Sequence, residues 1–389
     1  MPRMESVEAF LTLLKRSELL SLEQLLDLRT LSDSQQTPRE LANWLVKQHW
    51  LTRWQATQLL DGHEQLRVGK YRLLDLIGRG GMGLVFLAEP TPPQATPEPS
   101  ATDRSRSAPF DSQNLVALKV MTQLGNPKGV KRYLQEVQAA TALDHPHIVT
   151  TLDSGIADGC HFLVMEFLPG RDLNAIMRDQ SPLPVSWSCE VIRQTALGLQ
   201  YAFEQGLVHR DIKPHNILVT PEPDFLTPHA RILDFGLAHI AAESNSLRDV
   251  TQTGAVLGTA DYISPEQAMS AKHADIRSDI FGLGCTLFQL ITGELPFQGN
   301  NVMEKLMARI TTIPPSVSAL RAEAHSDLDD LVTNMLRTNP NDRPQTPAEV
   351  AAELDGLTLK IRRHELRITR LSPRKLSPHA QSRSRLRRS

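Results

Sequence analysis

The pattern of apolar and polar residues divides the chain into a helical beginning, a stretch of strands and a long helical remainder. Through residues 4–62 apolar residues recur at helical intervals, and Thr37 followed by Pro38 is typical of a helix start. Three tryptophans are expected to pack between these helices, namely Trp44, Trp50 and Trp54. The pattern therefore predicts a small helical segment over residues 1–65, without a cluster of ionisable residues that would indicate catalysis.

Beyond this segment the pattern changes to that of β-strands. It predicts three strands, at residues 71–77, 84–89 and 115–121. Between the second and the third lie residues 90–114, whose many Pro, Ser, Thr and Ala residues cannot bury enough apolar surface to fold. We predict a disordered insertion there. From about residue 186 onward helical patterns dominate.

Composition and charge limit the class of protein. A net charge of −2, with 40% hydrophobic and 22% charged residues, is ordinary for a globular protein. The overall charge therefore gives no indication of nucleic-acid binding. The three cysteines lack the spacing of a disulfide framework or a zinc site. No run is long and apolar enough to span a membrane, and the N-terminus does not resemble a signal peptide. We therefore expect a cytoplasmic protein.

The C-terminal part of the chain is strongly basic. Residues 359–389 contain eleven Lys or Arg residues and one acidic residue. Such tails are usually disordered. We predict a basic disordered tail over residues 358–389, which is either only solvated or contacts an acidic partner, such as the rest of this chain or a nucleic acid.

A Gly-x-Gly-x-x-Gly motif lies between the first two predicted strands, at Gly78, Gly80 and Gly83. The motif alone is weak evidence, because it cradles phosphates in more than one fold. In a dinucleotide-binding fold it leads into a helix, whereas here the residues at 85–87 (Val-Phe-Leu) favour a strand. Two strands joined by a glycine turn form a flap whose backbone N–H groups can cover phosphates. Such a flap predicts a lysine on the next strand, where Lys119 lies.

Three further motifs follow along the chain. They are His-Arg-Asp-Ile-Lys-Pro-His-Asn at 209–216, Asp-Phe-Gly at 234–236 and Ser-Pro-Glu at 264–266. In this order, from about residue 71 to 357, the motifs resemble those of the eukaryotic-type, PknB-like Ser/Thr protein kinases of bacteria. The resemblance implies an α+β, bilobal protein kinase fold, with a small β-rich lobe and a large helical lobe, preceded by the helical segment. It also implies ATP and Mg²⁺ as cofactors and proteins with Ser or Thr as substrates.

The resemblance assigns residues to nucleotide binding. Lys119, paired with Glu136, would hold the α- and β-phosphates. Met165 matches the gatekeeper, and Glu166 and Leu168 would offer backbone groups to adenine. The other expected ATP contacts are Ile77, Gly78, Gly80, Gly83, Val85, Ala117 and Leu218.

The same resemblance assigns catalytic roles in the large lobe. Asp211 would accept the proton of the incoming hydroxyl, and Lys213 would neutralise charge on the γ-phosphate. Asn216 and Asp234 would supply oxygen ligands to Mg²⁺.

Two alternatives to a protein Ser/Thr kinase are weighed. A pseudokinase scaffold would bind ATP without transfer, but pseudokinases typically lack one of Lys119, Asp211 and Asp234, which are all present. A small-molecule kinase is the weaker alternative. Lys213 and Thr259 match Ser/Thr protein kinases rather than either tyrosine or small-molecule kinases.

The resemblance also implies regulation and support. Arg210 would hold a phosphorylated activation loop, in which Thr251 and Thr253 align with autophosphorylated threonines. Arg343 is expected to pair with Glu266, and Asp279 matches a structural aspartate. The helical segment resembles that of planctomycete kinases and is a candidate docking or oligomerising module, and the family suggests a possible homodimer.

Overall fold

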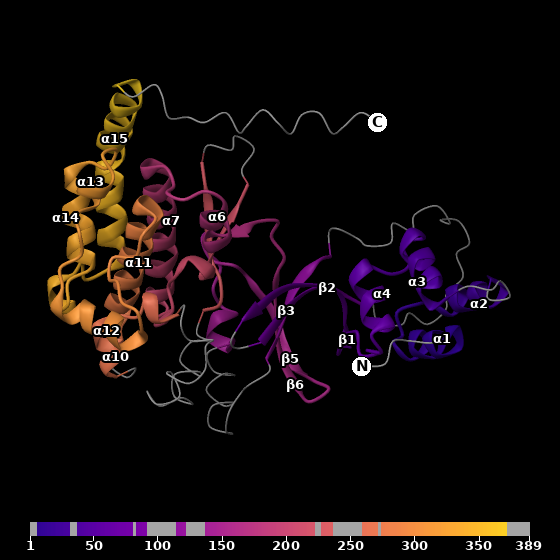
Figure 1. Cartoon of the computed structure of the whole chain (residues 1–389). Coiled ribbons are helices and arrows are strands. Elements are labelled where there is room, and N and C mark those ends of the chain that lie inside the picture. Colours follow the sequence, from indigo (N-terminus) through magenta and orange to yellow (C-terminus); the bar gives the residue numbers. More distant parts are fainter. Residues whose placement is uncertain are drawn as a thin grey trace. The chain divides into compact units, whose positions relative to one another are not determined.

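The computed structural model describes residues 6–31, 37–80, 83–91, 114–121, 137–221, 227–235, 259–270 and 274–371 (Figure 1). The chain forms two compact units. The first unit comprises Met1–Asp144 and Val149–Leu168, and the second comprises His145–Ile148 and Pro169–Ser389.

The first unit begins with four short helices. They are α1 (Val7–Arg16), α2 (Leu22–Leu31), α3 (Pro38–Lys47) and α4 (Arg53–Leu60). Thr37 caps α3 in a capping box with Glu40, and Pro38 occupies the first turn, as its fixed φ allows. Phe10, Leu14 and Leu45 are fully buried in the core between the helices, and the three tryptophans pack against this core. The helical character predicted for the first 65 residues is confirmed.

The first unit continues as a six-stranded antiparallel sheet in the order β1-β2-β3-β4-β6-β5. Its strands are β1 (Arg67–Val68), β2 (Tyr71–Gly80), β3 (Gly83–Pro90), β4 (Val116–Met121), β5 (Thr151–Ala157) and β6 (Cys160–Glu166). Asp158 and Gly159 join β5 to β6 with φ of 52° and 75°, the left-handed values of a tight hairpin turn. The three strands predicted from the sequence are β2, β3 and β4. Residues 92–113, which carry most of the predicted insertion, lie outside the described residues.

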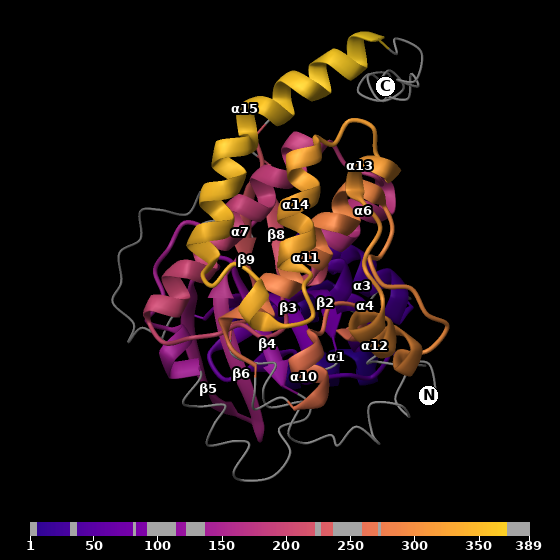
Figure 2. The same ribbon diagram turned by 90° about the vertical axis from the view of Figure 1, so that its left-hand side faces the viewer.

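The second unit combines a small sheet with a set of helices (Figure 2). The sheet has the order β7-β8-β9, formed by β7 (Arg171–Asp172), β8 (Ile217–Thr220) and β9 (His229–Ile232). The α-helices are α6 (Leu173–Asp179), α7 (Val185–Glu204), α10 (Pro265–Met269), α11 (Ile276–Thr292), α12 (Val302–Thr311), α13 (Val317–Leu320), α14 (Ser326–Met335) and α15 (Pro347–Leu371). The described residues of this unit also form the 3-10 turns η1 (Pro214–Asn216), η3 (Thr259–Asp261) and η5 (Pro340–Asp342).

Helix α11 is the core of the second unit and contacts α7, α14 and α15. Fourteen of its seventeen residues are buried. Its two interior glycines leave room for neighbours. A Cβ at Gly282 would lie 2.7 Å from the Ile212 carbonyl oxygen, and a Cβ at Gly284 would lie 2.9 Å from Met335 Cβ. Gly282 and Gly284 therefore allow α11 to pack closely against the neighbouring backbone and side chains. None of the helices in the described part of the chain is long and apolar enough to cross a membrane.

Helix α15 corrects one prediction. It continues to Leu371, so residues 358–371 are helical and do not belong to a disordered tail. Leu354 and Ile361, two helical turns apart, are both fully buried and hold this part of the helix on the unit. Lys360 also forms an ion pair of 2.7 Å with Asp327. Residues 372–389, the rest of the predicted tail, lie outside the described residues.

Candidate active site

The predicted glycine-rich motif lies at the end of the β2–β3 hairpin, where Gly80 pairs with Gly83. At Gly83 a Cβ would lie 2.0 Å from the Val120 carbonyl oxygen on β4, so a side chain does not fit. At Gly80, in contrast, an added Cβ has no described atom within 4 Å. Strand pairing therefore explains the glycine at 83, whereas no contact with the described residues requires the one at 80.

Lys119 and two of the predicted apolar contacts lie on one face of the sheet. Val85 on β3 is paired with Lys119 on β4, and Ala117 lies two residues before Lys119 on the same strand. Phe86 and Leu118, their neighbours in sequence, point to the opposite face and belong to its hydrophobic core. Lys119 is only 6% exposed, so its ammonium group is held in a largely buried position.

The predicted adenine contacts Glu166 and Leu168 lie at and just after the end of β6. The Glu166 N–H donates to the Thr150 carbonyl oxygen at 3.0 Å, and its carboxylate accepts from the Thr150 N–H at 2.8 Å. These bonds fix the backbone where the first unit ends. Because the N–H is already used, only the carbonyl of Glu166 can serve a nucleotide.

In the second unit the predicted catalytic residues converge on the carboxylate of Asp211. The Lys213 ammonium lies 2.8 Å from Asp211 Oδ2. The Asn216 amide donates from Nδ2 to the Asp211 backbone oxygen at 2.7 Å and to Oδ2 at 3.0 Å. Both charged side chains keep a small exposure, 17% for Asp211 and 14% for Lys213. The 3-10 turn η1 brings Asn216 back toward Asp211, because its first residue is a proline that presets φ.

The loop that carries Asp211 is anchored by Asp279 on α11. The fully buried Asp279 carboxylate accepts the backbone N–H of His209 at 2.8 Å and that of Arg210 at 2.6 Å. Burial raises the pKa of Asp279 to about 6, against the effect of His209 and Arg210, which lower it. Arg210 has a φ of 64°, an unfavourable value for a residue with a side chain, and the two bonds to Asp279 maintain it.

Asp234, the predicted metal ligand, has a similarly unusual backbone, with a φ of 58°. It follows Leu233, whose N–H donates to the Asn216 carbonyl oxygen at 2.9 Å. The Leu233 carbonyl in turn lies 2.8 Å from His209 Nε2, and the His209 ring packs edge-on against Phe235 at 4.9 Å between centroids. These bonds connect the backbone around Asp234 to the loop of Asp211. Left-handed φ at Arg210 and Asp234, both in predicted functional motifs, is typical of active sites.

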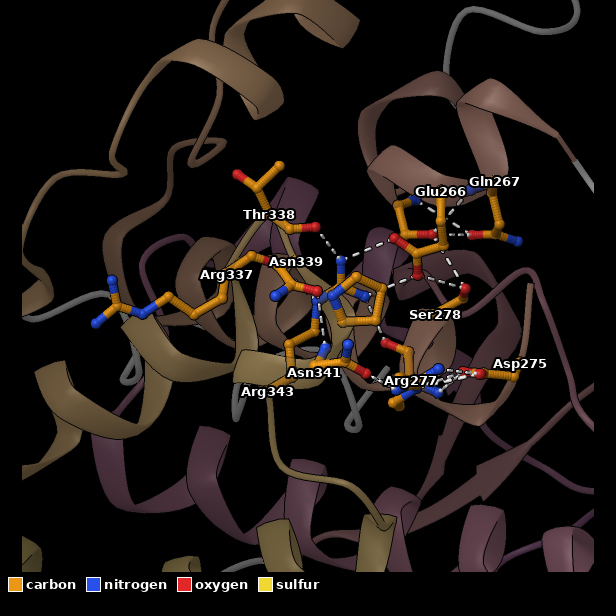
Figure 3. Close-up of polar contacts among 12 residues, drawn as sticks. Glu266, Gln267, Asp275, Arg277, Ser278, Arg337, Thr338, Asn339, Asn341 and Arg343 are labelled. Carbon is orange, nitrogen blue, oxygen red and sulfur yellow. Dashed lines mark hydrogen bonds and ion pairs between the residues drawn. The ribbon is translucent and has the colours of Figure 1, made fainter. Parts of the chain in front are cut away.

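The expected pairing of Arg343 with Glu266 is confirmed (Figure 3). Two parallel bonds of 2.8 Å join the guanidinium to the carboxylate, and the Arg343 side chain is fully buried. Ser278 Oγ also donates to Glu266 at 2.7 Å. Burial raises the pKa of Glu266, but the hydrogen bonds and charge of Arg343 outweigh it and hold this pKa below its ordinary value.

Several supporting residues escaped the sequence reasoning. Gln267 closes a capping box with Ser264 at the start of α10, and its Nε2 donates to the Arg210 carbonyl oxygen at 2.9 Å. The Ser-x-x-Gln spacing at 264–267 was the available signal. Residues 260–262, a few positions before this helix, are also held by side chains from α11 and α12, namely Arg309 to the Ala260 oxygen, Lys305 to Asp261 and Gln289 to Tyr262.

Some predicted residues fall on parts of the chain that are not described. Glu136, Thr251 and Thr253 lie outside the described residues. Thr259 begins η3, but its side chain is not described. Leu218, the last predicted adenine contact, lies on β8 in the second unit. The structure thus places the predicted nucleotide residues mainly in the first unit and the catalytic residues in the second.

Comparison with known proteins decides the family. The sequence profile described as "Protein kinase domain" matches residues 106–353, more than half of the chain. The chain belongs to the protein kinase family. The fold class predicted from the sequence is therefore confirmed. The kinase profile starts after the glycine-rich motif and after residues 92–105, so the first three strands precede the matched region.

Curated kinases and solved kinase structures resemble this chain. The serine/threonine-protein kinase pkn3 of Myxococcus xanthus is 36% identical over 302 residues, which are 76% of this chain and 51% of pkn3. The serine/threonine-protein kinase PknB of Mycobacterium tuberculosis is 35% identical over 291 residues, 73% of this chain and 42% of PknB. The chain thus spans about half the length of these kinases. The crystal structure of the Mycobacterium tuberculosis PknI kinase domain matches with a TM-score of 0.55 and 26% identity, over 75% of this chain and 97% of that domain.

Proposed function

We propose that this chain is a protein serine/threonine kinase that transfers the γ-phosphoryl group of ATP to Ser or Thr hydroxyls of proteins. The observation that carries the proposal is the carboxylate of Asp211, with Lys213 at 2.8 Å and the Asn216 amide at 3.0 Å. Phosphoryl transfer needs an oriented hydroxyl, a place for its proton and positive charge near the phosphates. These three side chains have the chemistry for each requirement.

In the proposed reaction the substrate hydroxyl donates its hydrogen bond to Asp211. The hydroxyl oxygen then forms the bond to the γ-phosphorus, the bond from this phosphorus to the β–γ bridging oxygen breaks, and the hydroxyl proton passes to Asp211. The products are the phosphorylated protein and ADP. Lys213 offsets negative charge on the transferred group and keeps the carboxylate in one orientation.

The residues fit a magnesium ion. Because Asn216 uses its Nδ2 in two bonds to Asp211, its Oδ1 is the amide atom left for a metal, and Asp234 supplies a carboxylate. Such hard oxygen ligands suit Mg²⁺, which when bound neutralises phosphate charge. For ATP we propose the predicted contacts in the first unit together with Leu218, which the shared face of Val85, Ala117 and Lys119 supports.

We also propose activation through phosphate on the activation loop. The Arg210 side chain has a buried Nε without a hydrogen-bond partner among the described residues. A buried guanidinium donor without an acceptor is costly, and a phosphothreonine supplies three acceptor oxygens. Thr251 and Thr253 remain the proposed sites. Transfer of phosphate to a protein acceptor would also distinguish this function from that of a small-molecule kinase. The homodimer stays a prediction.

Asp211→Asn tests the proposed function. The full chain is incubated with labelled ATP and Mg²⁺, and phosphate on Ser or Thr is measured. Losing the base should lower the rate by about 10²–10⁴. Asp179→Asn, which removes an exposed carboxylate 59% accessible on α6, is the matched control and should retain the wild-type rate. Bound ATP without transfer in the wild type would instead favour the pseudokinase scaffold. Phosphopeptides from the active protein in which both Thr251 and Thr253 are unmodified would contradict the proposed sites.

A further inference from the structure

The start of α4 in the helical segment contacts β2 where the β2–β3 ladder is irregular. Leu73 pairs with Ala88, but Asp75 pairs with Leu87, so Leu74 is an extra residue in β2. Such a bulge leaves the extra residue outside the ladder. On its other side β2 pairs with the two residues of β1 only as far as Arg72. The carbonyl oxygens of Leu73 and Leu74 therefore need hydrogen-bond donors from another part of the chain.

Two side chains at the start of α4 supply these donors. Thr52 Oγ1 donates to the Leu74 carbonyl oxygen at 2.6 Å, and Gln55 Nε2 donates to the Leu73 carbonyl oxygen at 2.6 Å. Gln55 is only 1% exposed. Burying a glutamine costs little folding free energy only when both the nitrogen and the oxygen of its amide have hydrogen-bond partners.

The same two side chains also form the capping box of α4. Thr52 Oγ1 accepts the Gln55 N–H at 3.0 Å, and Gln55 Oε1 accepts the Thr52 N–H at 2.9 Å. Each side chain thus joins the first turn of α4 to the bulge in β2. Next to them, Trp54 packs on Phe86 of β3 at 5.6 Å between ring centroids. Phe86 lies on the sheet face opposite to Val85 and Lys119. Helix α4 therefore supports the β2–β3 hairpin on the face that does not carry Lys119.

We propose that Thr52 and Gln55 are positioning residues for the glycine-rich loop. A bulge bends its strand and increases the local twist, so this one sets the direction in which β2 continues toward a second irregularity of the ladder, between Leu76 and Gly78. Those residues, 75–80, carry Ile77, Gly78 and Gly80. The helical segment then belongs to the nucleotide site and acts on it through β2. This inference rests on the proposed function, because it assigns the loop to ATP.

The structure offers a substitution that separates the contact to β2 from the helix cap. In Gln55→Glu the Oε1 acceptor for the Thr52 N–H remains, and glutamate is a preferred capping-box residue. The donor to Leu73 is lost, and a carboxylate faces a carbonyl oxygen instead. The chain also contains a matched control. Thr37 and Glu40 form the equivalent capping box of α3, where Glu40 is exposed and accepts the Thr37 N–H at 2.8 Å. Glu40→Gln makes the reverse exchange away from the sheet.

Steady-state kinetics on the full chain test the proposal. Gln55→Glu should raise the KM for ATP at least about threefold, since one hydrogen bond is lost and the new carboxylate is repelled by the Leu73 carbonyl, with kcat changed by less than about twofold. Glu40→Gln should leave both constants unchanged. Thr52→Ser, which keeps the hydroxyl, should behave as the wild type, whereas Thr52→Val should raise the KM. A lower melting temperature of Gln55→Glu with an unchanged KM would mean a purely structural contact and would overturn the proposal.

Hydrogen exchange gives a readout that does not depend on catalysis. The amides of residues 75–80 and 83–89 should exchange faster in Gln55→Glu than in the wild type or in Glu40→Gln. A wild-type chain without phosphotransfer, in which this difference is still seen, would overturn the proposed function and support the positioning role. Unchanged exchange in a chain that does transfer phosphate would overturn the positioning role and leave the proposed function standing.

Discussion

Three amide side chains each join two separate parts of the chain. Gln55 joins α4 to β2, Asn216 joins the 3-10 turn η1 to Asp211, and Gln267 joins α10 to the backbone of Arg210. An amide can donate and accept at once, so one buried side chain satisfies groups on both sides. At the scale of single residues, the geometry of the candidate site depends on such bridges and on the buried carboxylate of Asp279.

We expect Asp279→Asn to lower kcat about ten- to hundredfold, because the two N–H groups bind separate carboxylate oxygens and asparagine replaces one of these with an NH2 group. Bonds to a charged group contribute about 1.5–3 kcal/mol. The KM for ATP should change by less than about threefold, since strands β2–β4 are untouched. Initial rates at varied ATP measure both constants. Asp329→Asn, which alters a carboxylate that accepts the Ser318 N–H at 2.9 Å, is the control. A wild-type kcat in Asp279→Asn would contradict the anchoring role.

The pH dependence of the unfolding free energy, compared between the wild type and this variant, should reveal the raised pKa of Asp279. Its pKa is about 6 in the folded chain against an ordinary value of 3.8, so the folded state binds the proton more tightly. Its stabilising contribution is full below the ordinary pKa and is lost as the pH rises to about 6, a change of about 3 kcal/mol. Urea unfolding from about pH 4 to about pH 8 compares the wild type with Asp279→Asn, so that other carboxylates cancel. If the unfolding free energies of the two proteins change with pH in parallel, Asp279 does not contribute this pH-dependent stability.

Sequence motifs identify residues that carry the chemistry, but not the residues that hold them in place. Asp211, Lys213 and Asn216 lie within six residues of one another, so a local pattern reveals them. Gln55 and Gln267, in contrast, have partners 18 and 57 residues away. A glutamine in a helix start has no property in the sequence that predicts such a distant partner.

At the scale of elements, hydrophobic periodicity predicted the N-terminal helices, strands β2–β4 and a mainly helical chain after about residue 186, whereas glycines and helix ends depended on tertiary contacts. A glycine inside a helix costs about 1 kcal/mol relative to alanine, yet Gly282 of α11 lies directly against the Ile212 carbonyl next to Asp211. Residues 358–389 were predicted to form a disordered tail because they are basic. Helix α15 continues to Leu371 instead, with Ile361 fully buried.

Gly282→Ala should destabilise the second unit and impair catalysis. Its Cβ would approach the Ile212 oxygen to 2.7 Å, so either α11 or the loop of Asp211 must move. We expect a loss of about 1–3 kcal/mol in unfolding free energy, typical of overpacking, together with a lower kcat. Gly356→Ala in α15 is the control, because its Cβ meets nothing within 4 Å, and it should stabilise the chain by up to about 1 kcal/mol. Equal effects of the two substitutions in denaturant unfolding would refute the packing argument.

At the scale of the whole molecule, the folded chain extends beyond the region that matches the kinase profile on both sides. Before residue 106 lie the four helices and strands β1–β3, and the helices share hydrogen bonds with β2. After residue 353 helix α15 continues for 18 residues. The sequence pattern separated the four helices as an accessory segment, and the basic composition separated the end of α15 as a tail, because the contacts that join these parts to the rest of the chain are long-range in the sequence.

Truncation tests where the second unit ends. A chain that stops after Leu357 loses Ile361, which is fully buried, the Lys360–Asp327 ion pair of 2.7 Å and the 3.0 Å contact between His364 Nε2 and the Ala322 oxygen. Removing one buried isoleucine costs about 2–5 kcal/mol, and the exposed ion pair adds at most about 1 kcal/mol. A chain that stops after Leu371 keeps all three contacts and should melt with the full chain. If both truncated chains melt at the temperature of the full chain, residues 358–371 do not stabilise the unit, and the predicted boundary at 357 is adequate after all.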